Sequence, residues 1–102
     1  MSFEIHHEKN TSVIYLNGRF VFDSHKSFRE TYDQALARGD TRDIQLDMDK
    51  LEYLDSSALG MLLMLKDKAA TAGKTIQITN LKGMARQVLE IANFHKIFTI
   101  IS

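Results

Sequence analysis

The chain has 102 residues, of which 44% are hydrophobic and 25% are charged, and it contains no cysteine. These values are typical of one small globular domain, so we expect a single domain over residues 1–102 and no intrinsic disorder. The formal net charge of zero provides no basic excess for direct nucleic acid binding, and the lack of cysteine excludes disulfides, thiol nucleophiles and thiolate metal sites.

The first forty residues predict two strands and one helix. Residues 3–8 and 12–16 are expected as strands, the second because it is rich in β-branched and aromatic side chains. Asn17-Gly18 predicts a turn. Residues 24–38 predict a helix that ends before Gly39, and its apolar residues recur at helical spacing: Phe28, Tyr32, Ala35 and Leu36.

The middle of the chain predicts a strand and then a second helix. Apolar and polar residues alternate over residues 44–48, which is typical of a half-buried strand. After a short polar break, the second helix is expected from about Ser57 to Thr71, stopping at Gly73. The leucines that we expect to face inward from it are Leu59, Leu62, Leu63 and Leu65.

The C-terminal third predicts two more strands around a third helix. Residues 76–78 alternate as a short strand, and residues 98–101 are expected as the last strand. Residues 84–92 predict a helix whose apolar face consists of Met84, Val88 and Ile91.

Together these elements predict an α/β fold in the order β-β-α-β-α-β-α-β. We expect a small mixed β-sheet of four or five strands with three helices. Alternating strands favour helices packed mainly on one face of the sheet, while the other face stays partly wet. Strand-helix-strand connections favour parallel strand pairs in the middle of the sheet.

The most informative stretch is Ile44 to Lys66, in which a strand leads to a helix that begins at Asp55-Ser56-Ser57. Two hydroxyls beside a carboxylate at a helix start form an exposed corner that can be chemically modified. A phosphate on such a serine would add roughly −1.5 to −2 charges next to the helix N-terminal amides. This placement favours a switch over a catalyst.

The residues from Asp55 to Gly60, Asp-Ser-Ser-Ala-Leu-Gly, follow a strand and begin an apolar helix that ends at Ala72-Gly73-Lys74. In this context they closely resemble the STAS domain of anti-sigma-factor antagonists. The resemblance covers nearly the whole chain, including Asn17-Gly18 before the first helix and the closing segment 91–98. It implies the STAS fold.

The resemblance also implies a function and its site. In that family the serine after the aspartate is phosphorylated by a GHKL-type kinase that is also the anti-sigma factor. The unmodified domain binds this partner and frees a sigma factor, and a PP2C-type phosphatase resets it. By motif position the phosphorylated residue is Ser56, with Ser57 as an alternative minor site. The implied partner-binding residues are Asp55, Ser56, Ser57, Leu59, Gly60 and Asp23.

Two positions depart from the family pattern. Members usually have glycine where this chain has Ala58. Many have an aspartate three residues after the turn glycine, where this chain has Val21 and the acidic residue is Asp23. We therefore expect the acidic contact with the partner to be either shifted or absent.

The same residues allow simpler interpretations. Ser56 would also suit a helix N-cap, because serine oxygens accept amide hydrogen bonds there. Met61 and Met64 lie off the main inward stripe, so they are either ordinary core and rim or a modest exposed patch. His6 and His7 are adjacent on a strand and point to opposite faces, which disfavours a shared metal.

An alternative function also fits the family. Some small STAS domains are structural subunits of ABC-type membrane transport or of large signalling assemblies, without a phosphorylation cycle. The intact Asp-Ser-Ser motif favours the phosphorylation switch. A neighbouring gene for a kinase and phosphatase, or for an ABC transporter, would separate the two functions.

Enzymatic activity is not expected. The sequence has no Gly-x-Ser-x-Gly elbow and no Gly-rich phosphate loop, and we expect no cofactor. The apolar run at residues 61–65 is far shorter than the ~20 residues that span a bilayer, and the start MSFEIHHEKN lacks a signal-peptide pattern. We expect a cytoplasmic protein without direct membrane insertion.

Overall fold

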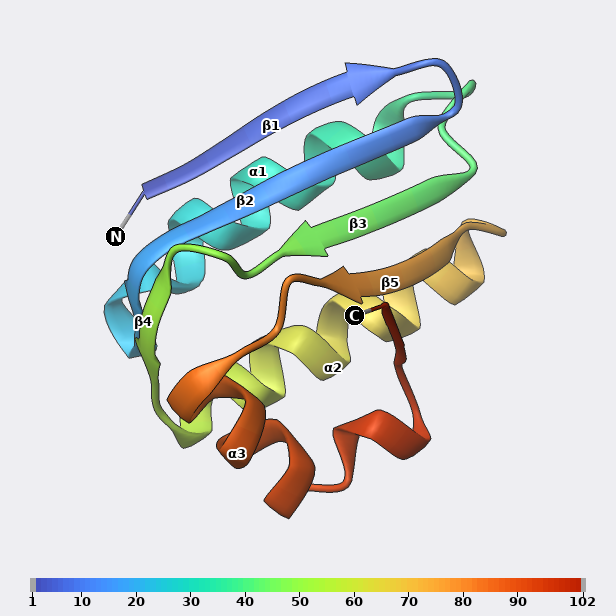
Figure 1. The fold of residues 1–102 in the computed structure, drawn as a ribbon. Coiled ribbons are helices and arrows are strands. Elements are labelled where there is room, and N and C mark those ends of the chain that lie inside the picture. Colours follow the sequence, from blue (N-terminus) through green and yellow to red (C-terminus); the bar gives the residue numbers. More distant parts are fainter. Residues whose placement is uncertain (1, 102) are drawn as a thin grey trace.

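The computed structural model describes residues 2–101 and is organised around one six-stranded sheet (Figure 1). Five strands lie side by side in the order β1-β2-β3-β5-β6. The remaining strand, β4, pairs with the second half of β2. β1 and β2 are antiparallel, and every other pair is parallel. The strands are β1 (Ser2–Glu8), β2 (Thr11–Phe20), β3 (Asp43–Asp47), β4 (Leu51–Leu54), β5 (Thr75–Thr79) and β6 (Thr99–Ile101).

Three helices complete the fold. Helices α1 (His25–Ala37) and α2 (Ser56–Thr71) lie behind the sheet in Figure 1, and α3 (Gly83–Ile91) packs against β4. Short 3-10 turns precede α1 and follow α3, at Phe22–Ser24 and Phe94–Lys96. Within residues 2–101, no helix combines the length and the apolar character that crossing a bilayer requires.

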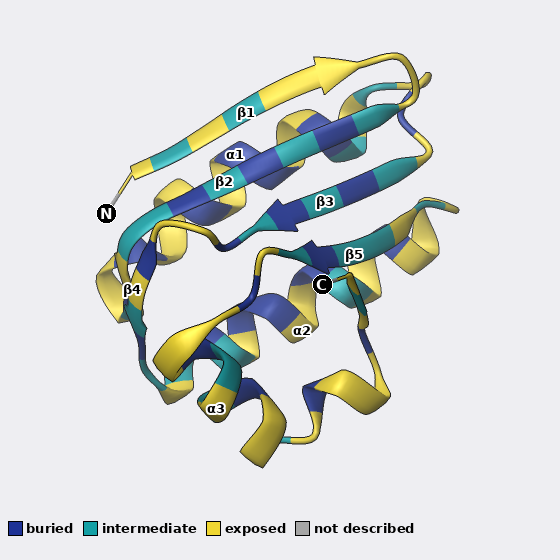
Figure 2. Cartoon of the chain, viewed as in Figure 1, coloured by how far each residue is buried: buried dark blue, intermediate teal, exposed yellow. Residues whose placement is uncertain are grey.

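The core lies between the sheet and its helices. Alternation along β2 and β3 turns one set of side chains inward, including Ile14, Leu16, Ile44 and Leu46, all of which are buried. Figure 2 shows the result as alternating buried and partly exposed bands along both strands. The opposite face of the sheet is partly exposed, and no helix within residues 2–101 covers it, as the alternation predicts.

The mixed α/β fold, its three helices and the order of the predicted elements are confirmed. The structure contains six strands instead of the four or five expected. The additional strand is β4, which lies in the predicted polar break between the strand at residues 44–48 and the second helix. With four residues, β4 is too short to show a clear alternation.

The predicted turn at Asn17-Gly18 is wrong, because β2 continues through it to Phe20. The strand changes register between Gly18 and Arg19, and Gly18 has a φ of 97°. Glycine adopts this backbone without strain, so the dipeptide stays within β2 at a β-bulge whose extra residue, Glu52, is on β4.

Two helix faces also differ from the prediction. In α2, Leu63 was predicted to face inward but is 39% exposed, whereas Met61 is buried. In α3 the buried residues are Ala85 and Leu89, and the predicted face residues Met84 and Ile91 are exposed. Apolar residues lie on several sides of α2, whereas those of α3 form one broad arc of which only one side is buried, so spacing alone could not identify the buried residues.

Gly18→Ala should lower the free energy of unfolding by about 1–3 kcal/mol, because alanine would be strained at positive φ. Gly39→Ala is the matched control: a side chain there meets no atom within 4 Å, so stability should stay within about 0.5 kcal/mol. Urea unfolding curves measure both. Equal effects at the two glycines would contradict the bulge.

Candidate functional site

The start of α2 is positioned by the second half of β2. Phe20 pairs with Leu54, the last residue of β4. The Asp55 amide then donates to the Phe20 carbonyl at 3.2 Å, and α2 begins at Ser56. Because β4 is parallel to β2 and ends at this point, the helix start is presented at one end of the sheet (Figure 1).

Asp55 is the N-cap of α2. Its backbone is extended, and its Oδ1 accepts hydrogen bonds from the Ser57 hydroxyl at 2.6 Å and from the Ala58 amide at 3.1 Å. The Ala58 amide is one of the donors that a helix start leaves without an intrahelical partner. The hydrogen bond from Ser57 is the main cause that lowers the pKa of the Asp55 carboxyl, and the Ala58 amide acts in the same direction.

The two serines of the motif have different surroundings. Ser57 is half-buried, and its hydroxyl is committed to Asp55. Ser56 is exposed, and in the described part of the chain its side chain makes no hydrogen bond. The capping interpretation of Ser56 is therefore wrong, because Asp55 performs that role. Ser56 presents a hydroxyl that a second molecule can reach.

A shallow apolar groove lies beside the serines. Its volume is about 240 Å³. Phe22 is 70% exposed there, and its ring is parallel to that of His25 at a centroid distance of 6.5 Å. The residues that line the groove are Phe22, His25, Ser57, Gly60, Met61 and Met64.

The remaining predicted site residues do not all reach this groove. Gly60 is exposed in its wall, whereas Leu59 is half-buried and packs against the core. Asp23 is exposed and lines a separate hollow of about 330 Å³ with Val21. Ala58 is fully buried, so this departure from the family pattern does not alter the exposed surface.

Sequence reasoning missed Phe22 and His25. Phe22 ends the apolar run Phe20-Val21-Phe22, so the sequence gives no signal that its side chain is exposed. Of the two methionines off the main inward stripe, Met64 is 46% exposed and Met61 is buried. The apolar patch therefore exists, but its most exposed member comes from the segment before α1.

The two adjacent histidines point to opposite faces of the sheet. The His6 ring packs edge-on against Tyr15 at a centroid distance of 5.4 Å, whereas His7 Nδ1 is 2.8 Å from the buried Ser12 hydroxyl. Across residues 2–101, no three histidine, aspartate or glutamate side chains converge as a metal ion would require.

Comparison with known proteins identifies related chains. The family model described as "Mlab, STAS domain" matches residues 3–101. A STAS-domain containing protein of Pseudomonas aeruginosa (strain UCBPP-PA14) is 39% identical over 88 residues, which cover 86% of this chain and 85% of that protein. The anti-sigma F factor antagonist of Paenibacillus polymyxa is 22% identical over 100 residues, covering 98% of this chain and 86% of that protein.

Among solved structures, the Bacillus protein SpoIIAA has the same fold. Its unphosphorylated form, described as an anti-sigma factor antagonist, matches with a TM-score of 0.75 at 19% identity, covering 99% of this chain and 88% of that one. Its phosphorylated form matches with a TM-score of 0.74 at the same identity, covering 99% and 92%.

Gly60→Ala should raise the free energy of unfolding by about 1 kcal/mol, because alanine favours a helix interior more than glycine does. The added methyl group meets no atom within 4 Å. The reverse change at the exposed Ala70 in the same helix should lower stability by about the same amount. Chemical denaturation measures both changes. A Gly60→Ala variant that is less stable than the parent protein would contradict the open space around Gly60.

Ser57→Ala should raise the pKa of Asp55 towards its ordinary value of 3.8, because the variant lacks the hydroxyl that stabilises the carboxylate. A lowered pKa in the folded state means that Asp55 stabilises the fold above pH 3.8 and loses this contribution as the pH falls through its folded pKa. Ser57→Ala should therefore reduce the loss of stability in acid.

Carbon-detected NMR titration of the carboxyl groups measures this shift. Asp49 is the internal control: its hydrogen bond to Lys82 lowers its pKa, and Ser57→Ala should leave that unchanged. An Asp55 pKa that stays the same without the Ser57 hydroxyl would disprove the cap as described.

Proposed function

The chain belongs to the STAS domain family, and from this premise we propose that it is an anti-sigma-factor antagonist switched off by phosphorylation of Ser56. Membership rests on the family model, which matches residues 3–101, and on the 39% identical STAS-domain protein. The antagonist function is supported by the likeness to the Paenibacillus antagonist and by the fold shared with SpoIIAA.

The observation that carries the proposal is the different state of the two serines. Ser56 is exposed, whereas Ser57 is half-buried and donates to Asp55. A kinase must bring a hydroxyl in line with the γ-phosphate of its nucleotide. Ser56 can meet this demand without loss of a hydrogen bond within the fold. Ser57 would first have to give up its hydrogen bond to Asp55, so it would be at most a minor phosphorylation site.

The switch acts on the surface and spares the fold. In the unmodified protein, the partner packs against Phe22, Met64 and Gly60 in the apolar groove beside Ser56. A phosphate on Ser56 adds roughly −1.5 to −2 charges next to the Asp55 carboxylate. The partner would then have to desolvate two adjacent anions, which weakens binding.

The partners follow from this role. The first is a GHKL-type anti-sigma kinase, which binds the unmodified corner and phosphorylates it. The second is a PP2C-type phosphatase, which restores Ser56. The chain itself is the substrate and not an enzyme, and Asp55, Asp23 and Gly60 border the contact in addition to the serines. We place this cycle in the cytoplasm, with no cofactor bound to the chain.

Ser56→Ala should keep the anti-sigma partner bound permanently, whereas Ser56→Asp should weaken binding at least tenfold, about 1.4 kcal/mol. Asp55 remains the cap in both variants. Their free energies of unfolding should therefore stay within about 0.5 kcal/mol of the parent protein. Calorimetric titration with the purified partner measures the affinities.

Gln34→Glu is the charge control, because it adds one negative charge at an exposed position of α1 away from the corner. It should bind like the parent protein. Equal affinities for the alanine, aspartate and phosphorylated forms would rule out the switch and favour a structural STAS subunit of a transport or signalling assembly. Phosphate found only on another residue, after incubation with partner and ATP, would also contradict the proposal.

A further inference from the structure

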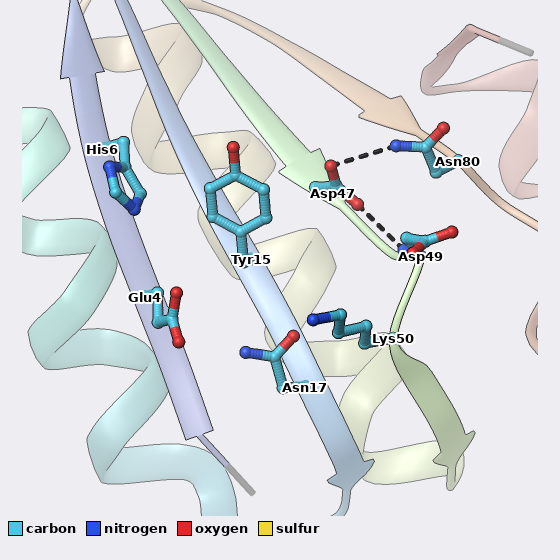
Figure 3. A pocket seen from close by; sticks show the side chains of 8 residues that line it. All are labelled: Glu4, His6, Tyr15, Asn17, Asp47, Asp49, Lys50 and Asn80. Atoms are coloured by element: carbon cyan, nitrogen blue, oxygen red, sulfur yellow. Dashed lines mark hydrogen bonds between the residues drawn. The ribbon is translucent and has the colours of Figure 1, made fainter.

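The open face of the sheet contains a cavity that the proposed switch does not use. Its volume is about 250 Å³. It lies at the carboxyl ends of β3 and β5, where Asp47 and Asn80 stand, and extends across β2 and β1 (Figure 3). The residues that line it are Glu4, His6, Tyr15, Asn17, Asp47, Asp49, Lys50 and Asn80.

The cavity arises because β2 changes its neighbour. The first half of β2 pairs with β3 up to Tyr15, and its second half pairs with β4 from Gly18. The segment 48–50 connects β3 to β4, and the Gly18 amide donates to the Lys50 carbonyl at 3.0 Å. Ligands commonly bind outside the carboxyl ends of parallel strands, where neighbouring strands diverge.

Three side chains form a row across the cavity floor. Glu4 pairs with Tyr15 between β1 and β2, and Tyr15 pairs with Asp47 between β2 and β3. Because paired residues lie on the same face, Tyr15 shares this face with a carboxylate on each neighbouring strand, and the His6 ring lies beside it (Figure 3). A cation over a tyrosine ring is attracted to its π-face, and the flanking carboxylates strengthen that attraction.

One carboxylate of this row is held in place. Asp47 Oδ1 accepts from the Asp49 amide at 2.9 Å, and Asp47 Oδ2 accepts from Asn80 Nδ2 at 3.0 Å. Both bonds orient the group without neutralising its charge, since neither donor is charged. Asp49 differs, because its carboxylate is paired with Lys82 at 2.8 Å.

The cavity also contains two opposite charges that are not paired with each other. In residues 2–101 neither Glu4 nor Lys50 takes part in an ion pair. Lys50 extends from the segment after β3 towards Asn17 on β2, whereas Glu4 lies on β1, on the other side of β2 (Figure 3). Such an arrangement suits a ligand with a cation at one end and an anion at the other.

We propose that this cavity binds a free basic amino acid of the arginine type. Its guanidinium lies over Tyr15 between Glu4 and Asp47, and its carboxylate lies at Lys50 and Asn17. Tyr15 and Asn17 are two residues apart on one strand, about 6.8 Å. The methylene stem of an arginine side chain spans such a gap. An anion alone would meet three carboxylates, and an apolar ligand would leave all of these polar groups unsatisfied.

NMR titration of the full chain with L-arginine tests the site. The amides of β1, β2 and the segment 48–50 should shift together, with a Kd of about 1 mM or lower. L-Citrulline, which has the same shape without the cation, should bind at least tenfold more weakly. Agmatine, which lacks the carboxylate, should also bind more weakly than arginine.

Glu4→Gln and Lys50→Met should each weaken arginine binding at least fivefold. Glu30→Gln and Lys26→Met are the matched controls, because these residues are exposed on α1, across the sheet from the cavity. Neither control should change the affinity for arginine. No saturable shifts up to 10 mM arginine, shifts outside the cavity, or equal binding of citrulline would overturn the proposal. None of these measurements involves Ser56, so they are independent of the proposed switch.

Discussion

The change of partner along β2 is the constraint on which the rest of the structure depends. One strand pairs with β3 by its first half and with β4 by its second half, and the bulge at Gly18 separates the two. Because β4 then ends beside Phe20, the chain enters α2 at a fixed point, with Asp55 as the cap. The same divergence opens the polar cavity on the other face of the sheet.

The division of roles within the Asp-Ser-Ser motif explains how a small domain could contain the proposed switch. Asp55 caps the helix, Ser57 holds Asp55, and Ala58 is buried in the core. These three residues maintain the helix start, so Ser56 is left without a structural role. A modification of Ser56 can then change what binds at the corner while the fold keeps its stability.

Much of the fold could be predicted from the sequence, because β3 and β5 alternate clearly and α1 has one apolar stripe. The sixth strand could not, because β4 has four residues and pairs with a distant segment. Asn17-Gly18 has the composition of a turn, and only pairing with β4 makes it a bulge. At the site, the motif located Ser56, but exposure of Phe22 depends on how the segment before α1 folds back beside α2.

The central claim is that phosphorylation of Ser56 changes binding and leaves the fold intact. The most direct test is an NMR spectrum of the stoichiometrically phosphorylated protein, recorded with and without the proposed anti-sigma partner. The account predicts that the amide signals of core residues such as Leu62 and Ile78 keep their positions on phosphorylation. Adding the partner should shift signals of the unmodified protein but not those of the phosphorylated protein. Loss of the core signals on phosphorylation, or unchanged partner binding, would contradict it.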